Sequence, residues 1–469
     1  MVKKPNLLFF GIDSLRRDHM SLYGYKRQTT PNISKYLSDG IVFEKCFSPS
    51  VPTTPGYASM MTGLDIFSTD VVALRHEGDY APGVKTLAEI LGENGYNTTC
   101  VGFGGNVGGK GYNKYLDFSG WGADRDDKRA HKAENLNDVA LPELERLAKE
   151  DKPFFLFLRH MDPHSPYLPP FPFSKMFYQK NEFDPSNKSL KECYEFKPFR
   201  DYFLEWFPVG CTDAEYVIAQ YDAAIAYMDS CIQNLLQKVA DLGIEEETLV
   251  VFTSDHGETL NDHNCYYDHH GTYDPTLVVP FALKLKGTTC VKGKRIADYC
   301  QLKDVTPTVL DLLGINPGIK FDGRNLMQVA RGECIRQEPE MYVTEATWMR
   351  KHGWRTPEWK LIIALEPDFH FKPPVELYNL IDDPDENRNV VDEEPEVVKY
   401  LTARMKAYIA KREKETGRVN PMESNATKWN GQGKPFASSE EAYNTMHIGS
   451  AEAAAKLQAK LAEIGVDIK

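Results

Sequence analysis

Acidic and imidazole side chains in two distant segments could together hold a metal ion. Asp13 follows a short apolar run, and a carboxylate at the end of a buried strand is costly unless it meets a cation or hydrogen-bond donors. Asp255 and His256 follow a second apolar run, and Gly257 after them permits a tight backbone approach. Four of the 12 histidines lie between residues 256 and 270. At Asp13 a loop cap or an Asp–Arg pair is an equal alternative, whereas the histidines favour an ion site over chance clustering on a solvated loop.

A third segment, residues 53–63, reads as a short helix. Thr54 suits an N-cap, Pro55 suits the first turn, and Gly63 suits the C-terminal end. These features alone describe an ordinary capped helix. The functional interpretation adds a hydroxyl at a helix N-terminus, where the dipole and free N–H groups attract an anion. A metal ion beside that hydroxyl would lower its pKa and make it a nucleophile.

Buried parallel strands are the elements that must position these segments. Apolar runs that end in polar or small residues predict strands, and they lie at 6–13, 98–103, 153–159 and 248–255. Between them, an apolar stripe over 218–242 predicts a helix that ends at Gly243. This alternation predicts an open, mostly parallel α/β sheet with helices on both faces. Ligands of such sheets bind beyond the carboxyl ends of the strands, where Asp13, Asp255 and His256 fall.

Composition excludes several classes of protein. The chain has 469 residues, of which 42% are hydrophobic and 26% charged, so it is not disordered, collagen-like or a coiled coil. A net charge of −13, with no cluster of Lys and Arg, argues against nucleic acid as a partner. No apolar run reaches the ~18 residues of a membrane helix or forms a signal-peptide core. The nine cysteines contain no C-x-x-C pair, which argues against a disulfide scaffold or a cysteine-based zinc site. We therefore expect a cytoplasmic protein with reduced thiols and no membrane partner.

The chain divides into three predicted parts. Residues 1–285 form the α/β domain, and 286–416 form a smaller α+β subdomain with helices at 303–314 and 393–412 and strands at 341–345 and 359–364. Residues 417–469 read as an extended tail with a short helix over 451–464, too poor in apolar residues to form its own core. Such a tail wraps its own chain or a neighbour, and we expect a homo-oligomer formed through it. An aromatic-rich insert, 174–211, is a lid or a surface elaboration.

Taken together, the order and spacing of the motifs resemble the sulfatase-like branch of the alkaline phosphatase superfamily, from residue 5 to about 415. The motifs that carry the resemblance are Asp13 followed by SLRRDHMSLYGY, TTPNI (29–33), Thr62-Gly63, GYNTTCVGF (95–103), MDPHSPY (161–167), TSDHGETLNDH (253–263), HHGTYDPTLVVP (269–280), DVTPTVLDLLGI (304–315), DGRNL (322–326) and ELYNLIDDPDENRNV (376–390). The resemblance implies an alkaline-phosphatase-like fold and hydrolysis of an ester.

The resemblance also implies metal ligands. Asp13, Asp255 and His256 match metal-ligand positions of the family. Ser14 stands where many sulfatases carry a second Asp and phosphonate monoester hydrolases carry Gln, so its shorter hydroxyl would reach the ion weakly or through water. The Asp-x-x-x-His of two-metal members is missing, because Ala226 and Gln233 stand four residues after the nearest acids. One divalent ion is therefore expected, and two carboxylates, one imidazole and a hydroxyl suit Zn, Mn, Ca or Mg.

Further positions imply contacts with the substrate. His164 matches the residue that contacts the transferred oxyanion, and His270 matches the Lys or His that binds the anion or protonates the leaving group. His263 matches the histidine of the family's G-E-H-G loop. Tyr57 and Asn106 are two additional candidates for contacts with the substrate.

The main departure from the family lies at the nucleophile. Sulfatases mature a Cys or Ser into formylglycine ten positions before the Gly of the Thr-Gly pair, and counting back from Gly63 gives Thr53. A threonine cannot become that aldehyde hydrate, Tyr57 replaces the arginine that orients it, and Phe103 follows Gly102 where sulfatases have a lysine. Thr53 is therefore the expected nucleophile and a fourth metal ligand.

An unmodified threonine restricts the choice of substrate. The ester that it forms with the transferred group must be cleaved by water at the central phosphorus or sulfur atom. Phosphothreonine hydrolysis at a metal site is well precedented in the superfamily, and sulfothreonine turnover is harder. A single cation with two histidines also suits a monoanion. These arguments favour a small phosphodiester or phosphonate monoester as substrate. A sulfuric ester hydrolase is the alternative, and a non-catalytic sulfatase-like protein is a third.

Overall fold

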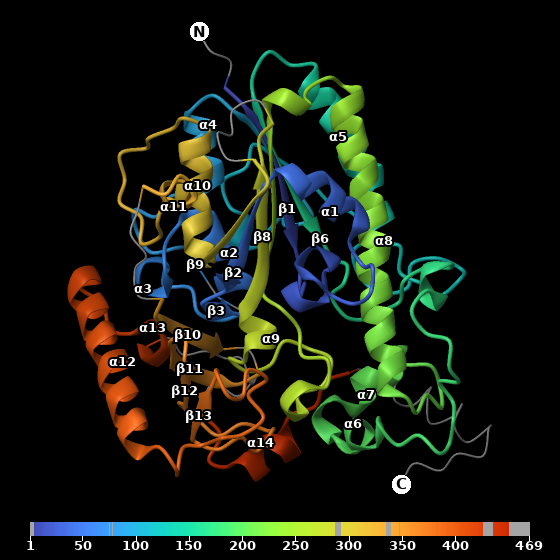
Figure 1. The fold of residues 1–469 in the computed structure, drawn as a ribbon, viewed down its shortest axis with the longest axis vertical. Helices are drawn as coiled ribbons and strands as arrows, with labels where there is room; N and C mark the ends of the chain where they lie inside the picture. The colour runs from blue at the N-terminus through green and yellow to red at the C-terminus, as the bar shows by residue number, and fades with distance from the viewer. Residues whose placement is uncertain are drawn as a thin grey trace.

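Two β-sheets form the framework of the chain (Figure 1). The computed structural model describes residues 4–74, 76, 78–286, 292–333, 339–346, 348–424 and 435–449. In these residues the large sheet has eight strands in the order β5-β4-β6-β1-β7-β8-β2-β9. Their bounds are β1 (Asn6–Ile12), β2 (Ile41–Phe47), β4 (Asn97–Val101), β5 (Lys114–Leu116), β6 (Phe154–His160), β7 (Thr248–Ser254), β8 (Val278–Lys284) and β9 (Lys294–Gln301).

The four strands predicted from apolar runs are neighbours in the large sheet. β4, β6, β1 and β7 lie side by side and parallel, and their observed bounds agree with the predicted ranges within two residues. β8 alone runs antiparallel to both of its neighbours, β7 and β2. The predicted mostly parallel sheet is confirmed. Since parallel strands end at the same edge, the segments after β6, β1 and β7 are brought together there.

Helices cover both faces of the large sheet because alternate strand residues are apolar on both sides. In β1, Leu8 and Phe10 belong to the core beneath α5 (Lys132–Ala148) and α8 (Ala214–Asp241), which lie together on one side of the sheet in Figure 1. Leu7 and Phe9 belong to the core on the other face. That face carries α2 (Thr53–Thr62), α4 (Leu87–Glu93), α10 (Val305–Leu312) and α11 (Leu326–Ala330).

The long predicted helix and its end are confirmed by α8. Its N-cap is Asp213, whose side chain accepts a hydrogen bond from the backbone N–H of Glu215. Its buried residues include Tyr221, Ile225 and Met228 on the predicted apolar stripe. Gly243 follows with φ 69°, a conformation that favours glycine and ends the helix.

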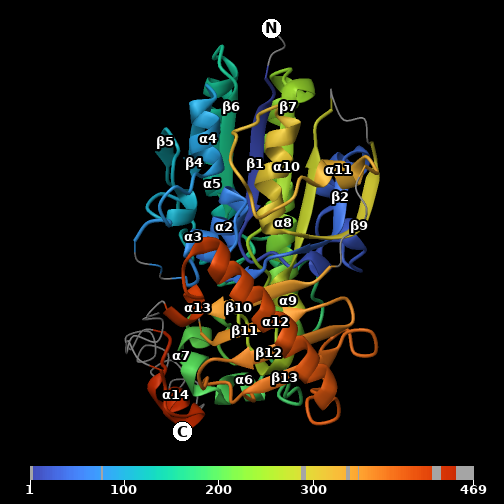
Figure 2. The ribbon, with the colours of Figure 1, turned by 90° about the vertical axis from the view of Figure 1, so that its left-hand side faces the viewer.

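A smaller sheet lies below the large one and is covered by α12 (Pro395–Thr416), as Figure 2 shows. Its order is β13-β12-β11-β10-β3. The strands are β3 (Ser50–Val51), β10 (Met341–Ala346), β11 (Arg350–Arg355), β12 (Trp359–Ala364) and β13 (Val375–Asn379). The predicted strands and helices of this region are confirmed by β10, β12, α10 and α12. The predicted boundary at residue 285 differs from the sheets, because β9 joins the large sheet and β3 joins the small one.

The insert and the described part of the tail pack on each other. The insert contains α6 (Lys191–Glu195) and α7 (Lys197–Trp206), and α14 (Ser439–Thr445) lies against α7. The hydroxyl of Tyr443 donates to the carbonyl of Glu195, and the N–H of Ile448 donates to that of Pro198. This part of the tail wraps its own chain. The helix expected at 451–464 lies outside the described residues, and oligomer formation through the tail stays a prediction.

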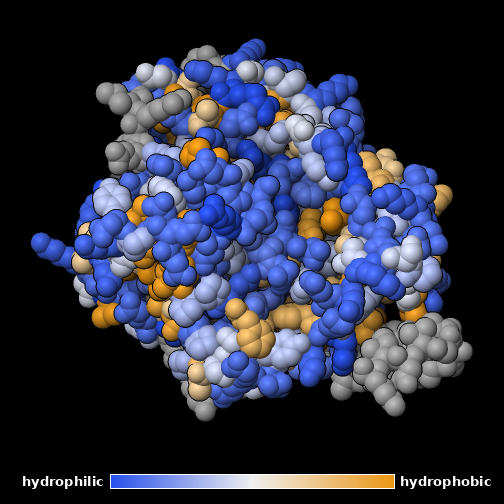
Figure 3. Space-filling model, turned by 60° about the horizontal axis from the view of Figure 1, so that its bottom comes forward, coloured by the Kyte–Doolittle hydropathy of each residue, from blue (hydrophilic) through white to orange (hydrophobic). Residues whose placement is uncertain are grey.

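The remaining short helices complete the element order. They are α1 (Pro31–Tyr36), α3 (Ile66–Thr69), α9 (Asp274–Leu277) and α13 (Pro421–Ser424). The end of the molecule that comes forward in Figure 3 is mostly hydrophilic, with a central hollow and separate apolar patches. Across the described ranges, no helix combines the length and apolar character needed to cross a bilayer. The seven described cysteines are buried free thiols.

Candidate active site

Two loops at the carboxyl edge of the large sheet bring the predicted metal ligands together. Asp13 follows β1, and Asp255 and His256 follow β7, the neighbour of β1. All three side chains are fully buried. One ligand atom from each lies within 4.8 Å of the others. The prediction of a shared site from two ends of the chain therefore corresponds to one compact cluster.

Thr53 enters this cluster as the first residue of α2. Its Oγ1 lies 3.1 Å from Nε2 of His256. The approach depends on Gly56, because a Cβ there would lie 2.6 Å from the backbone oxygen of Asp255. Gly257 has a similar role, since a Cβ at this position would lie 1.9 Å from the carbonyl oxygen of Pro275. Gly56 thus allows the helix that carries Thr53 to meet the loop after β7, and Gly257 allows that loop to pack against α9.

The imidazole of His256 is arranged as an acceptor or ligand. Its Nδ1 lies 2.7 Å from the carbonyl oxygen of Gly257, so Nδ1–H donates and Nε2 keeps its lone pair. Nε2 lies 3.4 Å from Oδ2 of Asp255 and 3.7 Å from Oδ1 of Asp13. Burial lowers the pKa of His256 to about 3, so the ring is neutral at pH 7. A neutral imidazole with a fixed tautomer is the form that binds metal ions.

Asp255 gives the clearest sign that this cluster suits a cation. Its Oδ1 accepts the backbone N–H groups of Ser14 and His256, but Oδ2 has no hydrogen-bond partner among the described residues. Burial, and then the charge of Asp13, raise the pKa of Asp255 well above its ordinary value. An ionised carboxylate in this position is costly without a cation. Two carboxylates, an imidazole and the Thr53 hydroxyl fit a divalent ion.

Ser14 holds the two carboxylates in place. Its hydroxyl donates to Oδ1 of Asp13 at 3.2 Å, and its backbone N–H donates to Oδ1 of Asp255 at 3.2 Å. Its φ of 60° is unusual for a residue other than glycine and aims both donors at the carboxylates. The predicted role of Ser14 as a metal ligand stays a prediction.

Arg159 is a member of the cluster that the sequence interpretation missed. Its Nε donates to Oδ2 of Asp13 at 3.0 Å, and its guanidinium lies 4.5 Å from the ring centroid of Phe103. Burial alone would raise the pKa of Asp13, but Arg159, His164 and His256 outweigh burial and hold that pKa well below its ordinary value. Its position could have indicated this role, because Arg159 lies at the carboxyl end of β6, the strand beside the one that Asp13 follows.

Removing the Arg159 charge is expected to destabilise the metal-free protein more than the metal-loaded one. Arg159→Met leaves Asp13 buried and unpaired, which costs about 3–5 kcal/mol of unfolding free energy without a metal. A bound divalent ion would offset most of this loss by neutralising Asp13. Chemical unfolding with and without added Mn²⁺ measures both values.

Arg388→Met, which breaks an exposed pair with Glu393, is the matched control and is expected to cost at most about 1 kcal/mol. Equal destabilisation of Arg159→Met in the presence and absence of metal would contradict this account of Asp13.

His164 lies near the cluster, as predicted for a residue that faces the substrate. Its Nδ1 lies 2.8 Å from the carbonyl oxygen of Ser165, which leaves Nε2 as the acceptor. Its own carbonyl accepts from the buried Nζ of Lys132 at 2.6 Å, which fixes the loop. The ring of His164 lies 5.7 Å from that of His269, between centroids. His164 therefore borders the same space as His269.

His269, rather than its neighbour His270, approaches the predicted metal ligands. The ring of His269 lies 4.6 Å from that of His256, and its Nδ1 lies 2.8 Å from Oδ1 of Asp268. Burial alone would lower the pKa of His269, but Asp268 and then Glu258 raise it to about 10, so the ring is an imidazolium at pH 7. Sequence interpretation missed His269, Asp268 and Glu258.

His270 contacts a different group of side chains. Its Nδ1 lies 2.5 Å from Nε2 of His370, and its ring packs on Phe199 and Trp348. The structure does not bring His270 into contact with His256. The difference arises because successive residues of an extended loop direct their side chains to opposite sides.

The other three predicted substrate contacts lie at different depths. His263 stacks on Tyr273 at 3.9 Å between centroids and lines a separate pocket with Arg16. Tyr57 is fully buried and packs on Phe103. Asn106 is half-buried, and its Nδ2 donates to Oγ1 of Thr54, beside Thr53, at 3.2 Å. The structure thus separates His263 from the cluster and places Tyr57 within α2 and Asn106 beside the start of that helix. The substrate contacts of these three residues stay predictions.

Comparison with known proteins agrees with this architecture. Residues 5–315 match the family described as Sulfatase. The chain belongs to the sulfatase family. Residues 262–415 of this sulfatase-family protein also match the family described as N-sulphoglucosamine sulphohydrolase, C-terminal.

Individual relatives include proteins with different names. An arylsulfatase of Clostridium perfringens is 25% identical over 390 residues, 69% of this chain and 78% of that protein. The multifunctional alkaline phosphatase superfamily protein PehA of Trinickia caryophylli is 23% identical over 399 residues, 69% of this chain and 76% of that protein. The crystal structure of the phosphonate monoester hydrolase of Agrobacterium radiobacter superposes with a TM-score of 0.69 at 20% identity, covering 87% of this chain and 96% of that chain. The fold is therefore that of alkaline-phosphatase-like sulfatases.

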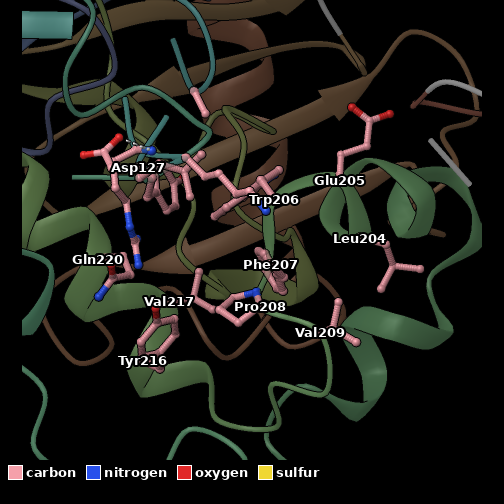
Figure 4. Close-up of a pocket in the computed structure, with 15 residues that line it drawn as sticks. Asp127, Leu204, Glu205, Trp206, Phe207, Pro208, Val209, Tyr216, Val217 and Gln220 are labelled. Atoms are coloured by element: carbon pink, nitrogen blue, oxygen red, sulfur yellow. Dashed lines mark hydrogen bonds between the residues drawn. The ribbon is translucent and has the colours of Figure 1, made fainter. Parts of the chain in front are cut away.

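A pocket of about 790 Å³ lies between the insert and α8 of this sulfatase-family protein (Figure 4). Trp206, Phe207 and Pro208 of the insert line it opposite Val217. Tyr167, three residues after His164, also lines it. The pocket places the insert beside the His164 loop. Both alternatives for the insert, a lid and a surface elaboration, stay predictions.

Substituting Asp255 is expected to abolish stabilisation by a metal. At about 100 times its dissociation constant, a divalent ion that binds only the folded protein adds about 2.7 kcal/mol to the free energy of unfolding. Asp255→Asn removes the unpartnered carboxylate oxygen and is expected to lose this gain. Thermal unfolding against metal concentration gives the shift. Asp382→Asn, on an exposed turn, should respond like the wild type, and a full metal response in Asp255→Asn would argue against the assigned ligand set.

Proposed function

We propose that this sulfatase-family hydrolase cleaves phosphate diesters or phosphonate monoesters with Thr53 as nucleophile. The observation that carries the proposal is the contact of Thr53 Oγ1 with Nε2 of His256, 3.1 Å away, inside the cluster of Asp13 and Asp255. Asp13, Asp255 and His256 would hold the divalent ion, and Thr53 would complete its ligands. When bound, the ion would supply Lewis-acid polarisation and a lowered pKa of the neighbouring hydroxyl.

The residues of the cluster suit a two-step displacement. In the first step Thr53 Oγ1, after giving its proton to solvent, forms a bond to phosphorus while the bond from phosphorus to the leaving oxygen breaks. His269, an imidazolium whose Nδ1 lies against Asp268, would give its Nε2 proton to that oxygen. In the second step water attacks phosphorus, the bond from phosphorus to Thr53 Oγ1 breaks and leaves that oxygen ionised again, and His269 takes up the proton that water loses. His164 would stabilise the charge on the transferred group.

Charge balance supports a substrate with one negative charge. The ionised carboxylates around the site are Asp13, Asp255 and Asp268, and its cations are Arg159 and His269. Burial raises the pKa of the nearby Glu258 well above its ordinary value, so that carboxyl is counted as neutral. A divalent ion would therefore leave a single surplus positive charge. A phosphodiester or phosphonate monoester carries one negative charge near pH 7, whereas a phosphate monoester carries nearly two.

Similar proteins support the same substrate class. One structural neighbour is a phosphonate monoester hydrolase, and one relative is described as a multifunctional member of the alkaline phosphatase superfamily. Thr53 favours this class over sulfate esters, because a threonine ester must be cleaved by water at the central atom.

Hydrolysis of a sulfuric ester is the second candidate. It is favoured by the family itself and by relatives such as the arylsulfatase of Clostridium perfringens. A sulfate monoester also carries one negative charge, so charge balance does not separate the two candidates. The nucleophile separates the two candidate substrate classes, because Thr53 lacks the aldehyde chemistry through which formylglycine releases sulfate.

A side-by-side assay tests the proposal. The purified protein, loaded in turn with Zn²⁺, Mn²⁺, Ca²⁺ and Mg²⁺, is offered bis(p-nitrophenyl) phosphate, p-nitrophenyl phenylphosphonate, p-nitrophenyl phosphate and p-nitrophenyl sulfate. We expect the first two to give the highest kcat/KM. A higher value for the sulfate would establish the second candidate, a higher value for the phosphate monoester would refute the charge argument, and no turnover would point to a non-catalytic protein.

A further inference from the structure

A second group of metal-binding side chains lies where the loop after β7 meets the small sheet. Cys265 and His270 belong to that loop, and His370 belongs to the segment between β12 and β13. One ligand atom from each of the three lies within 4.8 Å of the others. Cys265 and His270 are fully buried. Residues 100 positions apart are therefore gathered into an N₂S donor set, separate from the cluster of Asp13, Asp255 and His256.

The two imidazoles face each other, and a hydrogen bond to the backbone orients the ring of His370. Nδ1 of His370 lies 3.2 Å from the carbonyl oxygen of Asn264, so Nδ1–H donates and the lone pair is on Nε2. That Nε2 faces Nδ1 of His270 at 2.5 Å. Nε2 of His270 lies on the side of Asp268, 3.8 Å from its Oδ1. A histidine that directs one nitrogen at a carbonyl or carboxylate and the other at a shared point has the arrangement of a metal ligand.

We propose that Cys265, His270 and His370 bind a second metal ion of the zinc class, outside the candidate active site. One thiolate and two neutral imidazoles are ligands that zinc prefers, and they leave a fourth position for water or another donor. Tetrahedral bonds of about 2.0–2.1 Å would place the two nitrogens roughly 3.3 Å apart, so the rings need to separate by less than about 1 Å. The absence of a C-x-x-C pair argued against a cysteine-based zinc site. That argument does not apply to this site, because two of its three ligands are histidines and one comes from a distant loop.

A thiolate rather than a thiol ligates zinc, so binding of the ion at Cys265 would release the proton of its thiol. The ion would also fasten the loop at 265–270 to the small sheet.

Asp268 links this site to His269. Its Oδ1 lies 2.8 Å from Nδ1 of His269 and 3.8 Å from Nε2 of His270. A metal on Nδ1 of His270 would strengthen the contact from His270 Nε2–H to Asp268. His270 would thus act as a positioning residue for Asp268 and His269. Only this last consequence rests on the proposed function, and the metal site itself does not.

Cobalt substitution tests the site without an activity assay. The full chain is purified, loaded with Co²⁺ in place of zinc, and examined by absorption spectroscopy and elemental analysis. We expect two ions per chain and a thiolate-to-cobalt charge-transfer band in the near ultraviolet. Cys265→Ser is expected to lose the band and one ion, whereas Cys231→Ser, a buried cysteine of α8, keeps both.

Two further variants separate this site from the candidate active site. Asp255→Asn should lose one ion and all activity but keep the band. His370→Ala, which changes a half-buried side chain, should lose the band and one ion, and it serves if Cys265→Ser does not fold. Absence of the band in the Co²⁺-loaded wild type, or an unchanged band in the folded Cys265→Ser or His370→Ala variant, would overturn the proposal. Failure of the proposed function would instead appear as no turnover in a wild type that shows the band.

Discussion

Thr53→Ala is expected to lower kcat for bis(p-nitrophenyl) phosphate by about 10⁴-fold or more, because it removes the atom that attacks phosphorus. KM is expected to change much less, since Thr53 is one of several groups that would hold the substrate. The fold should be kept, because among the described residues the side chain of Thr53 hydrogen-bonds only to His256. Steady-state kinetics and metal content of the two proteins give the comparison.

The controls for this substitution keep the hydroxyl or move the change by one residue. Thr53→Ser keeps Oγ and is expected to retain most of the rate. Thr54→Ala removes a hydroxyl that donates to the carbonyl of Leu74, outside the cluster, and should have a small effect. Acid quenching during turnover should trap a phosphorylated peptide that contains Thr53. If Thr53→Ala stayed within about tenfold of the wild type, water rather than Thr53 would be the attacking group.

The second large effect is expected at His269. His269→Ala removes a cation and proton donor beside His256, and general-acid groups of this kind contribute about 10²–10⁴-fold to kcat. The loss should be largest for substrates with poor leaving groups, such as alkyl esters, and small for p-nitrophenolate, which leaves without a proton. A plot of rate against leaving-group pKa measures this difference.

The neighbouring substitution His270→Ala is the matched control for His269. It leaves the imidazolium in place and is expected to reduce kcat by at most about tenfold, with no steeper dependence on the leaving group. The pKa of His269, raised to about 10, adds a further expectation. Its imidazolium is present below that value, so the assistance is retained at neutral pH and is lost as the pH rises through it. A larger effect at His270 than at His269 would reverse the assignment.

Much of the large sheet follows from local sequence. The runs at 6–13 and 248–255 are continuously apolar because both faces of β1 and β7 are covered, and their polar ends mark the edge where ligands bind. Asp13, Asp255 and His256 could be singled out as candidates from that pattern. At Asp13 the pattern left an Asp–Arg pair as an equal alternative, and the structure contains such a pair, with Arg159. Their meeting in one cluster then follows from the pairing of β1 with β7.

Other parts of the site depend on contacts that no local pattern encodes. Arg159 reads as the last residue of a strand, and its role appears only when β6 lies beside β1. His269 and His270 are adjacent and of one type, so only the loop conformation shows which of them approaches His256. The boundary at 285 differs from the sheets for a similar reason, because pairing over long sequence separations assigns β9 and β3.

The short strand β3 has a consequence for any attempt to divide the protein. Ser50 and Val51 pair with Thr344 and Glu345 of β10, and the chain runs from β3 through Pro52 directly into Thr53. The polypeptide immediately before Thr53 is thus anchored in the small sheet by a strand some 300 residues later in the sequence. A chain truncated before β10 would keep Asp13, Asp255 and His256 but would leave Thr53 without this anchor. The two sheets are therefore expected to lose function together.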